Sequence, residues 1–364
     1  MITELNLRNF KCFESVDIPL KQVNILTGIN GMGKSTVIQS LLLLKQSCQD
    51  SDGFIGLKLN GNYTNLGNGQ DVLYEKASKD EIEIGFHVNN ISINFSFAYL
   101  PESDLLPLVT KSDIKNPIFN NNLFYLSAYR IEPQELYRVI NEDRLESREF
   151  GNTGEFAIQY LKAFGASTVS NRNIILRDRK GNENDTLGEQ VQLWLDMISP
   201  GVSPQINVDM KLRKTELKFE FIEGREKSNS YKSINVGFGI TYVLPVIVAL
   251  IAAREGDTIL IENPEAHLHP AGQRKLGELL AAVSAGGIQL IVETHSDHIL
   301  NGIRVAVKKS VIKASDANFL YFYKDSEDDF RHKIKNPILD EQGRIDEWPS
   351  GFFDEWDNAL MELL

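Results

Sequence analysis

One glycine-rich turn constrains the fold of this chain more than any other feature of the sequence. Residues 28–35 read GINGMGKS and match the pattern G-x-x-x-x-G-K-S/T. An apolar run at residues 23–26 precedes the turn, and residues 35–48 follow it with apolar side chains at helical spacing. A strand, a glycine loop and a helix in this order are typical of a phosphate-binding loop. The sequence therefore predicts an α/β fold that includes such a loop.

The chemistry of this loop depends on backbone amides, one cation and a hydroxyl. Glycines let successive N–H groups turn toward a phosphate, and the helix dipole adds to the attraction. Lys34 offers a cation to the β and γ oxygens, and Ser35 offers a hydroxyl to Mg²⁺. A tight strand-to-helix connection is the alternative, but lysine and serine together favour nucleotide binding. The residues expected at the nucleotide are Asn30, Gly31, Gly33, Lys34, Ser35 and Thr36.

Two further apolar strands end in polar residues. The segment TILIENPEAHLHP at residues 258–270 carries Glu262 at the end of its strand, where ligands bind in open α/β sheets. We expect Glu262 to hold Mg²⁺ through water, although it can also simply cap a strand. The segment IVETHSDHIL places His295 33 positions later. An imidazole there can sense the γ-phosphate and orient water, and a histidine satisfied within a turn is the alternative.

Four segments together resemble a known family. NFKCF near the start, GINGMGKST, IENPEAHLHP and ETHSDHIL resemble the ABC-type ATPases of the RecF/SMC and OLD (overcoming lysogenisation defect) group. The resemblance covers residues 1–85 and 230–305. It implies ATP and Mg²⁺ held between two subunits, each giving its Walker motifs to one nucleotide and a signature loop to the other. We therefore expect a homodimer or a higher homo-oligomer.

The resemblance assigns further residues around the nucleotide. NVGFGIT at residues 235–241 occupies the signature position, with Gly237 and Gly239 expected to donate N–H groups to the partner's γ-phosphate. Val236 replaces the usual serine, so a glycine-kinked helix start stays an alternative. By the same resemblance Gln70 is the glutamine that contacts the metal and Lys11 flanks the nucleotide, although a simple exposed lysine explains Lys11 equally well.

One departure from the family bears on catalysis. ABC-type enzymes usually carry a glutamate directly after the Walker B acid, and this sequence has Asn263 there. An amide can hold water but cannot accept its proton. Either Glu265 is the base or turnover is slow, and we favour slow hydrolysis with Glu265 contributing. The expected catalytic residues are Glu262, Asn263, Glu265 and His295.

The expected architecture is an α/β fold of the ABC-type P-loop NTPases, with a mixed sheet, an N-terminal antiparallel β subdomain and a partly helical insertion. We expect four segments. They are residues 1–100 with the Walker A loop, an insertion at 101–205, a second ATPase half at 206–318 and an acidic aromatic extension at 319–364.

Charge and composition exclude several classes of protein. The net charge of -12 excludes a uniformly basic coat for nucleic acid. The basic stretches at residues 171–180 and 211–218 are either a DNA-facing patch or a solvated outer face. Two cysteines are too few for a disulfide framework. Without an apolar signal peptide or a membrane-spanning run, we expect a cytoplasmic protein that does not associate with membranes.

Competing functions remain open at this point. Four histidines between residues 267 and 298 suggest a metal hydrolase, but their spacing is loose. OLD proteins continue into a Toprim nuclease domain, and about 60 residues after His298 leave no room for one. The resemblance thus implies a separately encoded effector, such as a nuclease in antiphage defence. The alternatives are a RecF-like clamp that binds DNA in repair and a non-hydrolysing nucleotide-dependent scaffold. The aromatic tail either docks a partner or packs on this chain.

Overall fold

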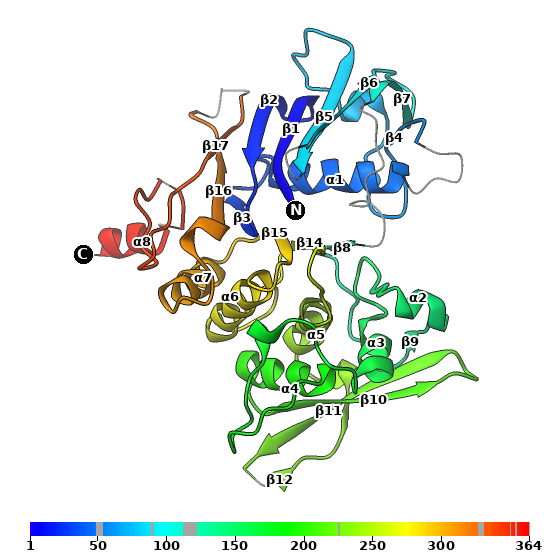
Figure 1. The fold of residues 1–364 in the computed structure, drawn as a ribbon, viewed down its shortest axis with the longest axis vertical. Helices are drawn as coiled ribbons and strands as arrows, with labels where there is room; N and C mark the ends of the chain where they lie inside the picture. The colour runs from blue at the N-terminus through cyan, green and yellow to red at the C-terminus, as the bar shows by residue number, and fades with distance from the viewer. Residues whose placement is uncertain are drawn as a thin grey trace. The chain divides into compact units, whose positions relative to one another are not determined.

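The computed structural model describes residues 1–48, 54–88, 91–111, 122–224, 226–326, 331–349, 351–353 and 355–363. These residues form two compact units (Figure 1). Unit 1 contains Met1–Phe124, Ser315–Asp340 and Ile345–Leu364, and unit 2 contains Tyr125–Ala314 and Glu341–Arg344.

Unit 1 contains a six-stranded antiparallel sheet with the strand order β2-β1-β5-β6-β7-β4. Alternation of apolar and polar residues explains why these segments are strands with one buried face. For example, Leu5 and Leu7 are fully buried, and Leu7 lies opposite Val16 on one side and Ile84 on the other. The strands are β1 (Ile2–Phe10), β2 (Phe13–Pro19), β4 (Gly56–Lys58), β5 (Glu81–Val88), β6 (Ile91–Ala98) and β7 (Leu105–Lys111).

The second strand group of unit 1 joins the two ends of the chain. Strand β3 (Val23–Gly28) is buried at all six residues and pairs in parallel with β16 (Ala317–Tyr323). β16 pairs antiparallel with β17 (Lys333–Lys335). The fifteen-residue helix α1 (Lys34–Cys48) follows β3 and lies along the antiparallel sheet (Figure 1). Unit 1 also contains the 3₁₀ turn η1 (Gly69–Asp71) and the last helix, α8 (Glu355–Leu363).

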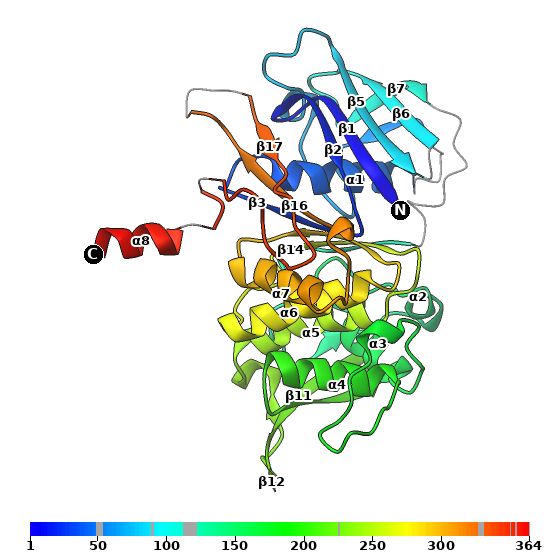
Figure 2. The ribbon, with the colours of Figure 1, turned by 60° about the vertical axis from the view of Figure 1, so that its left-hand side comes forward.

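Unit 2 contains a parallel strand pair with its connecting helix. Strands β14 (Thr258–Glu262) and β15 (Gln289–Glu293) pair in parallel, from Thr258 opposite Gln289 to Glu262 opposite Glu293. The helix α6 (Pro270–Ser284) connects them, and α7 (Asp297–Lys308) follows β15 and lies beside α6 in both views (Figures 1 and 2). The apolar helix α5 (Phe238–Ile251) is buried from Val243 to its end.

A β-hairpin and a helical layer complete unit 2. Strands β10 (Val202–Asp209) and β11 (Lys214–Glu223) form an antiparallel hairpin. The alternation of apolar and polar residues at 205–224 is typical of a hairpin or a meander. Helices α3 (Ala157–Phe164) and α4 (Leu187–Ile198) pack on α5 and on β10 (Figure 1). The remaining elements are β9 (Tyr137–Arg138), α2 (Glu142–Glu146), η3 (Arg172–Ile174), β12 (Glu226–Lys227), β13 (Tyr231–Lys232) and η4 (Ser233–Asn235).

The mixed α/β fold expected from the sequence is confirmed, because an antiparallel sheet and parallel strand pairs are both present. Two short elements, β8 (Leu123–Leu126) and η5 (Ala314–Asp316), lie where the chain passes between the units. The division into four segments stays a prediction, and β7, within the expected insertion, is a strand of the antiparallel sheet. None of the described helices combines the length and apolar character that a bilayer span requires.

Candidate functional site

The predicted phosphate-binding loop lies in unit 1, between β3 and α1. Lys34 is the first residue of α1 and only 3 % exposed. Its Nζ donates to the Gly28 carbonyl at 2.8 Å and to the Ile29 carbonyl at 3.0 Å. Burying an ammonium group is costly unless polar partners receive it. The loop therefore holds the lysine cation beneath its own backbone, at the start of a helix.

The glycines of this loop are required by its shape. Gly33 has φ +103°, and a Cβ there would lie 2.7 Å from the Cys12 Sγ and 2.8 Å from the Phe13 Cζ. Gly31 has φ +80°, and a Cβ there would meet nothing within 4 Å. Left-handed residues in such a turn direct backbone N–H groups into a concave, anion-binding surface. The open space at Gly31 and the helix start at Lys34 fit a phosphate group.

The hairpin turn that contains Lys11 and Cys12 packs against this loop. Cys12 Sγ lies 3.6 Å from the Thr36 Oγ1, within the motif. Lys11 is half-buried, burial lowers its pKa, and its Nζ donates to the Gln39 Oε1 at 2.8 Å. Since Gln39 belongs to α1, Lys11 lies beside the helix that begins with the motif. This is where a lysine that flanks the nucleotide is expected.

Gln70 belongs to the same unit, although its role stays a prediction. Its side chain is exposed on η1, and its backbone N donates to the Pro101 carbonyl at 3.1 Å. Two residues later, the Val72 carbonyl accepts a 2.7 Å hydrogen bond from the backbone N of Lys11. The Gln70 segment is therefore anchored to the end of β1.

The predicted carboxylate of Glu262 lies in unit 2 at the end of β14. Its Oε2 accepts a hydrogen bond from the backbone N of Ala128 at 3.1 Å, and the Tyr125 hydroxyl donates to the same side chain. Burial raises the pKa of Glu262, while these donors and Arg130 oppose the rise. The preceding four residues of β14 are fully buried. The strand thus delivers one half-buried carboxylate to its carboxyl end.

Asn263, Glu265 and His295 lie together next to this carboxylate. Asn263 has φ +43°, and its backbone N donates to the Glu293 carbonyl at 2.8 Å. The Glu265 Oε1 accepts from the backbone N of His295 at 2.9 Å. The Asn263 Oδ1 and the Glu265 Oε2 are buried and have no hydrogen-bond partner among the described residues. Oxygens of this kind accept hydrogen bonds from water, including water bound to Mg²⁺.

Arg130, which no sequence motif indicates, contacts the same turn. Its side chain is 3 % exposed and donates to the carbonyls of Ser127, Glu262 and Asn263 at 2.5, 2.9 and 2.6 Å. Burial lowers the pKa of Arg130 to about 10, and the carboxylates of Glu265 and Glu262 oppose that change. The only sequence signal was an arginine four residues after the short apolar segment LFYL.

The signature-like segment begins α5, also in unit 2. Gly237 caps the helix, is exposed, and would meet nothing within 4 Å if it carried a Cβ. A Cβ on Gly239 would lie 2.4 Å from the His267 carbonyl oxygen. The start of α5 therefore packs closely on the segment after β14. A cavity of about 470 Å³ is lined there by Gly237, Gly239, Ile240, His267, Leu268, His269, Ala271, Gly272 and residues 197–200.

The contacts of His267, His269 and His298, three of the clustered histidines, are as follows. The ring of His267 packs on Tyr242 and Phe238, with centroids 5.0 and 6.0 Å apart. His269 accepts from the backbone N of Ala271 at the start of α6, and His298 lies 3.6 Å from Asp297. Among the residues that the structure describes, no three His, Cys, Asp or Glu side chains form a metal-binding group. Mg²⁺ needs no such group, since one or two carboxylates and phosphate oxygens suffice.

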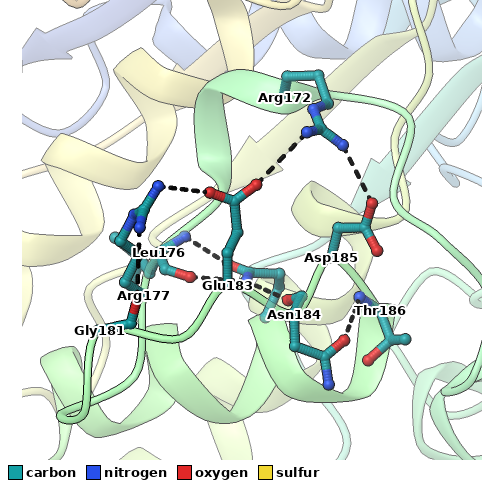
Figure 3. A network of polar contacts seen from close by, with 9 residues as sticks. Arg172, Leu176, Arg177, Gly181, Glu183, Asn184, Asp185 and Thr186 are labelled. Atoms are coloured by element: carbon teal, nitrogen blue, oxygen red, sulfur yellow. Dashed lines mark hydrogen bonds and ion pairs between the residues drawn. The ribbon is translucent and has the colours of Figure 1, made fainter.

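The basic stretch at residues 171–180 is largely neutralised by ion pairs. Arg172 contacts Asp185 at 3.0 Å and Glu183 at 3.4 Å, and Arg177 contacts Glu183 at 3.1 Å (Figure 3). Arg179 pairs with Asp196 at 3.0 Å. Exposed pairs of this kind contribute little stability, but they reduce the positive field available to DNA. This favours the interpretation of the stretch as a solvated face.

The aromatic tail divides between packing and exposure. Phe352 is fully buried in unit 1, with its ring 5.5 Å from that of Tyr321 and 5.2 Å from that of Trp348. Trp348 is 40 % exposed. The tail therefore packs at least in part on its own unit, through β16.

Comparison with known proteins assigns the family. Residues 23–301 match the model of the family described as "AAA domain, putative AbiEii toxin, Type IV TA system". The chain belongs to this family. The matched range includes the phosphate-binding loop, the turn after β14 and His295. Residues 312–363 match a second family, described as "Protein of unknown function (DUF3696)".

Two curated relatives and two solved structures agree with this assignment. The chain is 22 % identical to an "OLD nuclease" of Thermus scotoductus, over 90 % of this chain and 65 % of that protein. It is 22 % identical to an "ATP/GTP phosphatase" of Helicobacter pylori, over 82 % of this chain and 86 % of that protein. The chain thus spans less than two thirds of the length of the OLD nuclease.

The similar structures are SMC heads. A crystal structure of the SmcHead bound to the C-winged helix domain of ScpA has a TM-score of 0.54 at 16 % identity, over 93 % of this chain and 98 % of that one. An Smc head domain of Pyrococcus furiosus gives 0.53 at 13 % identity, over 100 % and 99 %. The chain therefore belongs to the AAA family matched above and shares the fold of SMC head domains.

Proposed function

We propose that this ATPase binds ATP with Mg²⁺, hydrolyses it slowly, and uses the bound state as a switch. The observation that carries the proposal is the glycine-shaped loop with Lys34 buried beneath it. In this role Lys34 and the backbone N–H groups of Asn30, Gly31 and Gly33 bind the phosphates. Lys11 flanks the nucleotide from the adjoining turn.

Three side chains are assigned to the metal, and none of them needs to move a proton. Ser35, Glu262 and Gln70 would hold Mg²⁺, which neutralises charge on the phosphate oxygens when it is bound. Ser35 is half-buried at the first turn of α1, and Glu262 is held by Ala128 and Tyr125. The half-buried position of Glu262 suits a ligand that is shielded from bulk water but remains reachable.

The attacking water is assigned to the turn after β14. The Asn263 Oδ1 and the Glu265 Oε2, both buried and unpartnered among the described residues, are free to accept its hydrogen bonds. Glu265 can take the proton and Asn263 cannot. His295, whose backbone N already binds Glu265, responds to the γ-phosphate. Because the base is not the residue directly after Glu262, we expect slow turnover.

We further propose that two copies of the chain associate around ATP. The exposed start of α5 offers the N–H groups of Gly237 and Gly239 to the nucleotide of a second copy. We also propose that the switch controls a nuclease effector in antiphage defence, in the cytoplasm, and similarity to an OLD nuclease supports the kind of effector. A nuclease gene beside the gene for this chain would support the effector; its absence would count against it.

A second candidate function is a non-hydrolysing scaffold, and Asn263 favours it. In that case ATP binds and drives association, but phosphate is not released. A DNA clamp is less favoured, because the arginines at residues 172–179 are paired with acids. If DNA stimulates phosphate release by the purified chain, that result would support the DNA clamp.

Replacing two lysines of the same helix tests the proposal. Lys34→Met removes the cation beneath the loop. Lys45→Met removes a second buried cation of α1, which donates to the carbonyl of Leu123 in β8. We expect Lys34→Met to lose ATP binding and the ATP-dependent rise in molecular mass, and Lys45→Met to keep both. Unchanged ATP affinity in Lys34→Met would refute the assignment of the loop.

A further inference from the structure

The geometry around Arg130 points to a role that the family assignment does not supply. We propose that Arg130 is a positioning residue for ATP hydrolysis, which holds the turn after β14 so that Glu262 and Asn263 keep their orientation. The inference rests on the proposed ATPase function. It concerns the backbone of the turn rather than any contact with the nucleotide.

Arg130 donates hydrogen bonds to backbone carbonyls of the turn and of the loop that precedes Arg130. Its Nη1 donates to the carbonyls of Ser127 and Glu262, and its Nη2 donates to the carbonyl of Asn263. A guanidinium group is planar and rigid, so its donors fix the relative directions of their acceptors. The loop before Arg130 also binds the Glu262 carboxylate through the backbone N of Ala128. Backbone and side chain of Glu262 are therefore held by one loop.

The turn requires such support because its backbone is unusual. Asn263 has φ +43°, in the left-handed region, which asparagine adopts more readily than other non-glycine residues but still only in a minority of cases. Beyond Glu262 the strand ladder between β14 and β15 ends, and the Asn263 N–H continues it only to the Glu293 carbonyl. Strained backbone of this kind persists where the surroundings determine it. Arg130 contributes to that determination through the carbonyls of Glu262 and Asn263.

Holding carbonyl groups with a buried cation costs free energy, because the cation loses its hydration. Arg130 is almost fully buried, and its Nε has no hydrogen-bond partner among the described residues. The carboxylates of Glu265 and Glu262 interact with it electrostatically. A neutral donor would tie the loop without the cost of burying charge. The positive charge instead allows two carboxylates, of Glu262 and Glu265, to lie near the same turn.

The test separates turnover from ATP affinity and folding. We would measure kcat, the equilibrium affinity for ATP and the unfolding temperature for Arg130→Met and Arg130→Lys. The matched control is Arg148→Lys, because Arg148 is also buried in unit 2 but pairs with a side chain, that of Asp257. Residues that orient metal ligands through hydrogen bonds are worth about 10- to 100-fold in metal affinity or activity.

We expect Arg130→Met to lower kcat per folded molecule by about 10- to 100-fold with ATP affinity within roughly threefold of wild type. Arg130→Lys keeps the charge but lacks the rigid fork, so we expect only partial recovery of kcat. Arg148→Lys is expected to change the unfolding temperature and leave kcat unchanged.

Two outcomes contradict different claims. Wild-type kcat per folded molecule in Arg130→Met overturns the positioning role and leaves the ATPase proposal intact. If Arg130→Met does not fold, the kcat of Arg130→Lys is the deciding measurement. A wild-type kcat in Arg130→Lys would then overturn the positioning role. No phosphate release by the wild-type chain refutes the ATPase proposal itself and this inference with it.

Discussion

At the scale of residues, the proposed reaction depends on different roles for Glu262, at the end of β14, and for Asn263 and Glu265, in the turn that follows. Glu262 is held by two donors, Asn263 presents a buried amide oxygen, and Glu265 presents a buried carboxylate oxygen. Of the two buried oxygens, only that of Glu265 belongs to a group that can accept a proton at neutral pH. The distance of Glu265 along the chain from Glu262 does not exclude it, since both belong to the same short turn.

Glu265→Gln tests this division directly. The amide keeps the size of the side chain and accepts hydrogen bonds but does not take a proton. We expect ATP to bind normally, kcat to fall by about 10²-fold or more, and the ATP-bound dimer to live longer. Phosphate release under single-turnover conditions and mass in solution measure the two effects. Unaltered turnover would exclude Glu265 as the base.

Asn263→Glu tests whether the asparagine after Glu262 limits turnover. It places a carboxylate directly after Glu262, at a cost of roughly 1–2 kcal/mol for the left-handed backbone. We expect faster phosphate release, by about tenfold. Asn263→Gln is the control, because it has the same length and no charge. Equal rates in the two variants would show that the asparagine does not limit turnover.

At the residue scale, short motifs predicted the positions of several residues in the fold, and their chemical roles stay predictions. Lys34 begins a helix at the loop, and the sequence placed Glu262 and His295 at strand ends, where the structure has them. Arg130 could not be found in this way. It acts on backbone carbonyls 132 and 133 positions further along the chain, and a carbonyl leaves no signature in a sequence.

At the scale of elements, apolar periodicity predicted most of what forms. The buried run at β3, the helix after Lys34 and the hairpin of β10 and β11 follow from patterns of period 3.6 or 2. Pairing between distant segments was not predictable, for example β3 with β16. The charge of residues 171–180 was visible, but the acids that neutralise it became clear only from the fold.

The loop between β3 and α1 gives an element-scale prediction with an internal control. Gly33→Ala combines a left-handed φ with a Cβ 2.7 Å from the Cys12 Sγ, whereas Gly31→Ala has the left-handed φ alone. Backbone strain costs roughly 1–2 kcal/mol in both. Gly33→Ala is therefore expected to lower the unfolding temperature and the ATP affinity more. Thermal unfolding and calorimetric titration measure this, and equal losses would contradict the predicted contact.

The start of α5 gives a second pair. A Cβ on Gly239 would collide with the His267 carbonyl, so Gly239→Ala is expected to destabilise unit 2. Gly237 is exposed and open, so Gly237→Glu is expected to fold normally. Its added negative charge should nevertheless abolish ATP-dependent association, because it repels the triphosphate of a second copy. A Gly237→Glu variant that still associates with ATP would refute the proposed role of this helix start.

At the scale of the whole molecule, the central claim is that one reaction depends on both the loop of Lys34 and the carboxylate of Glu262. The measurement is the rate of phosphate release from ATP with Mg²⁺ by the purified chain, by Lys34→Met and by Glu262→Gln. Glu278→Gln is the control, because Glu278 is a half-buried carboxylate of α6 that pairs with Arg274 and Lys275.

We predict slow, measurable release by the wild type and by Glu278→Gln, and none above background by Lys34→Met or Glu262→Gln. Wild-type release by Lys34→Met or by Glu262→Gln would contradict the claim.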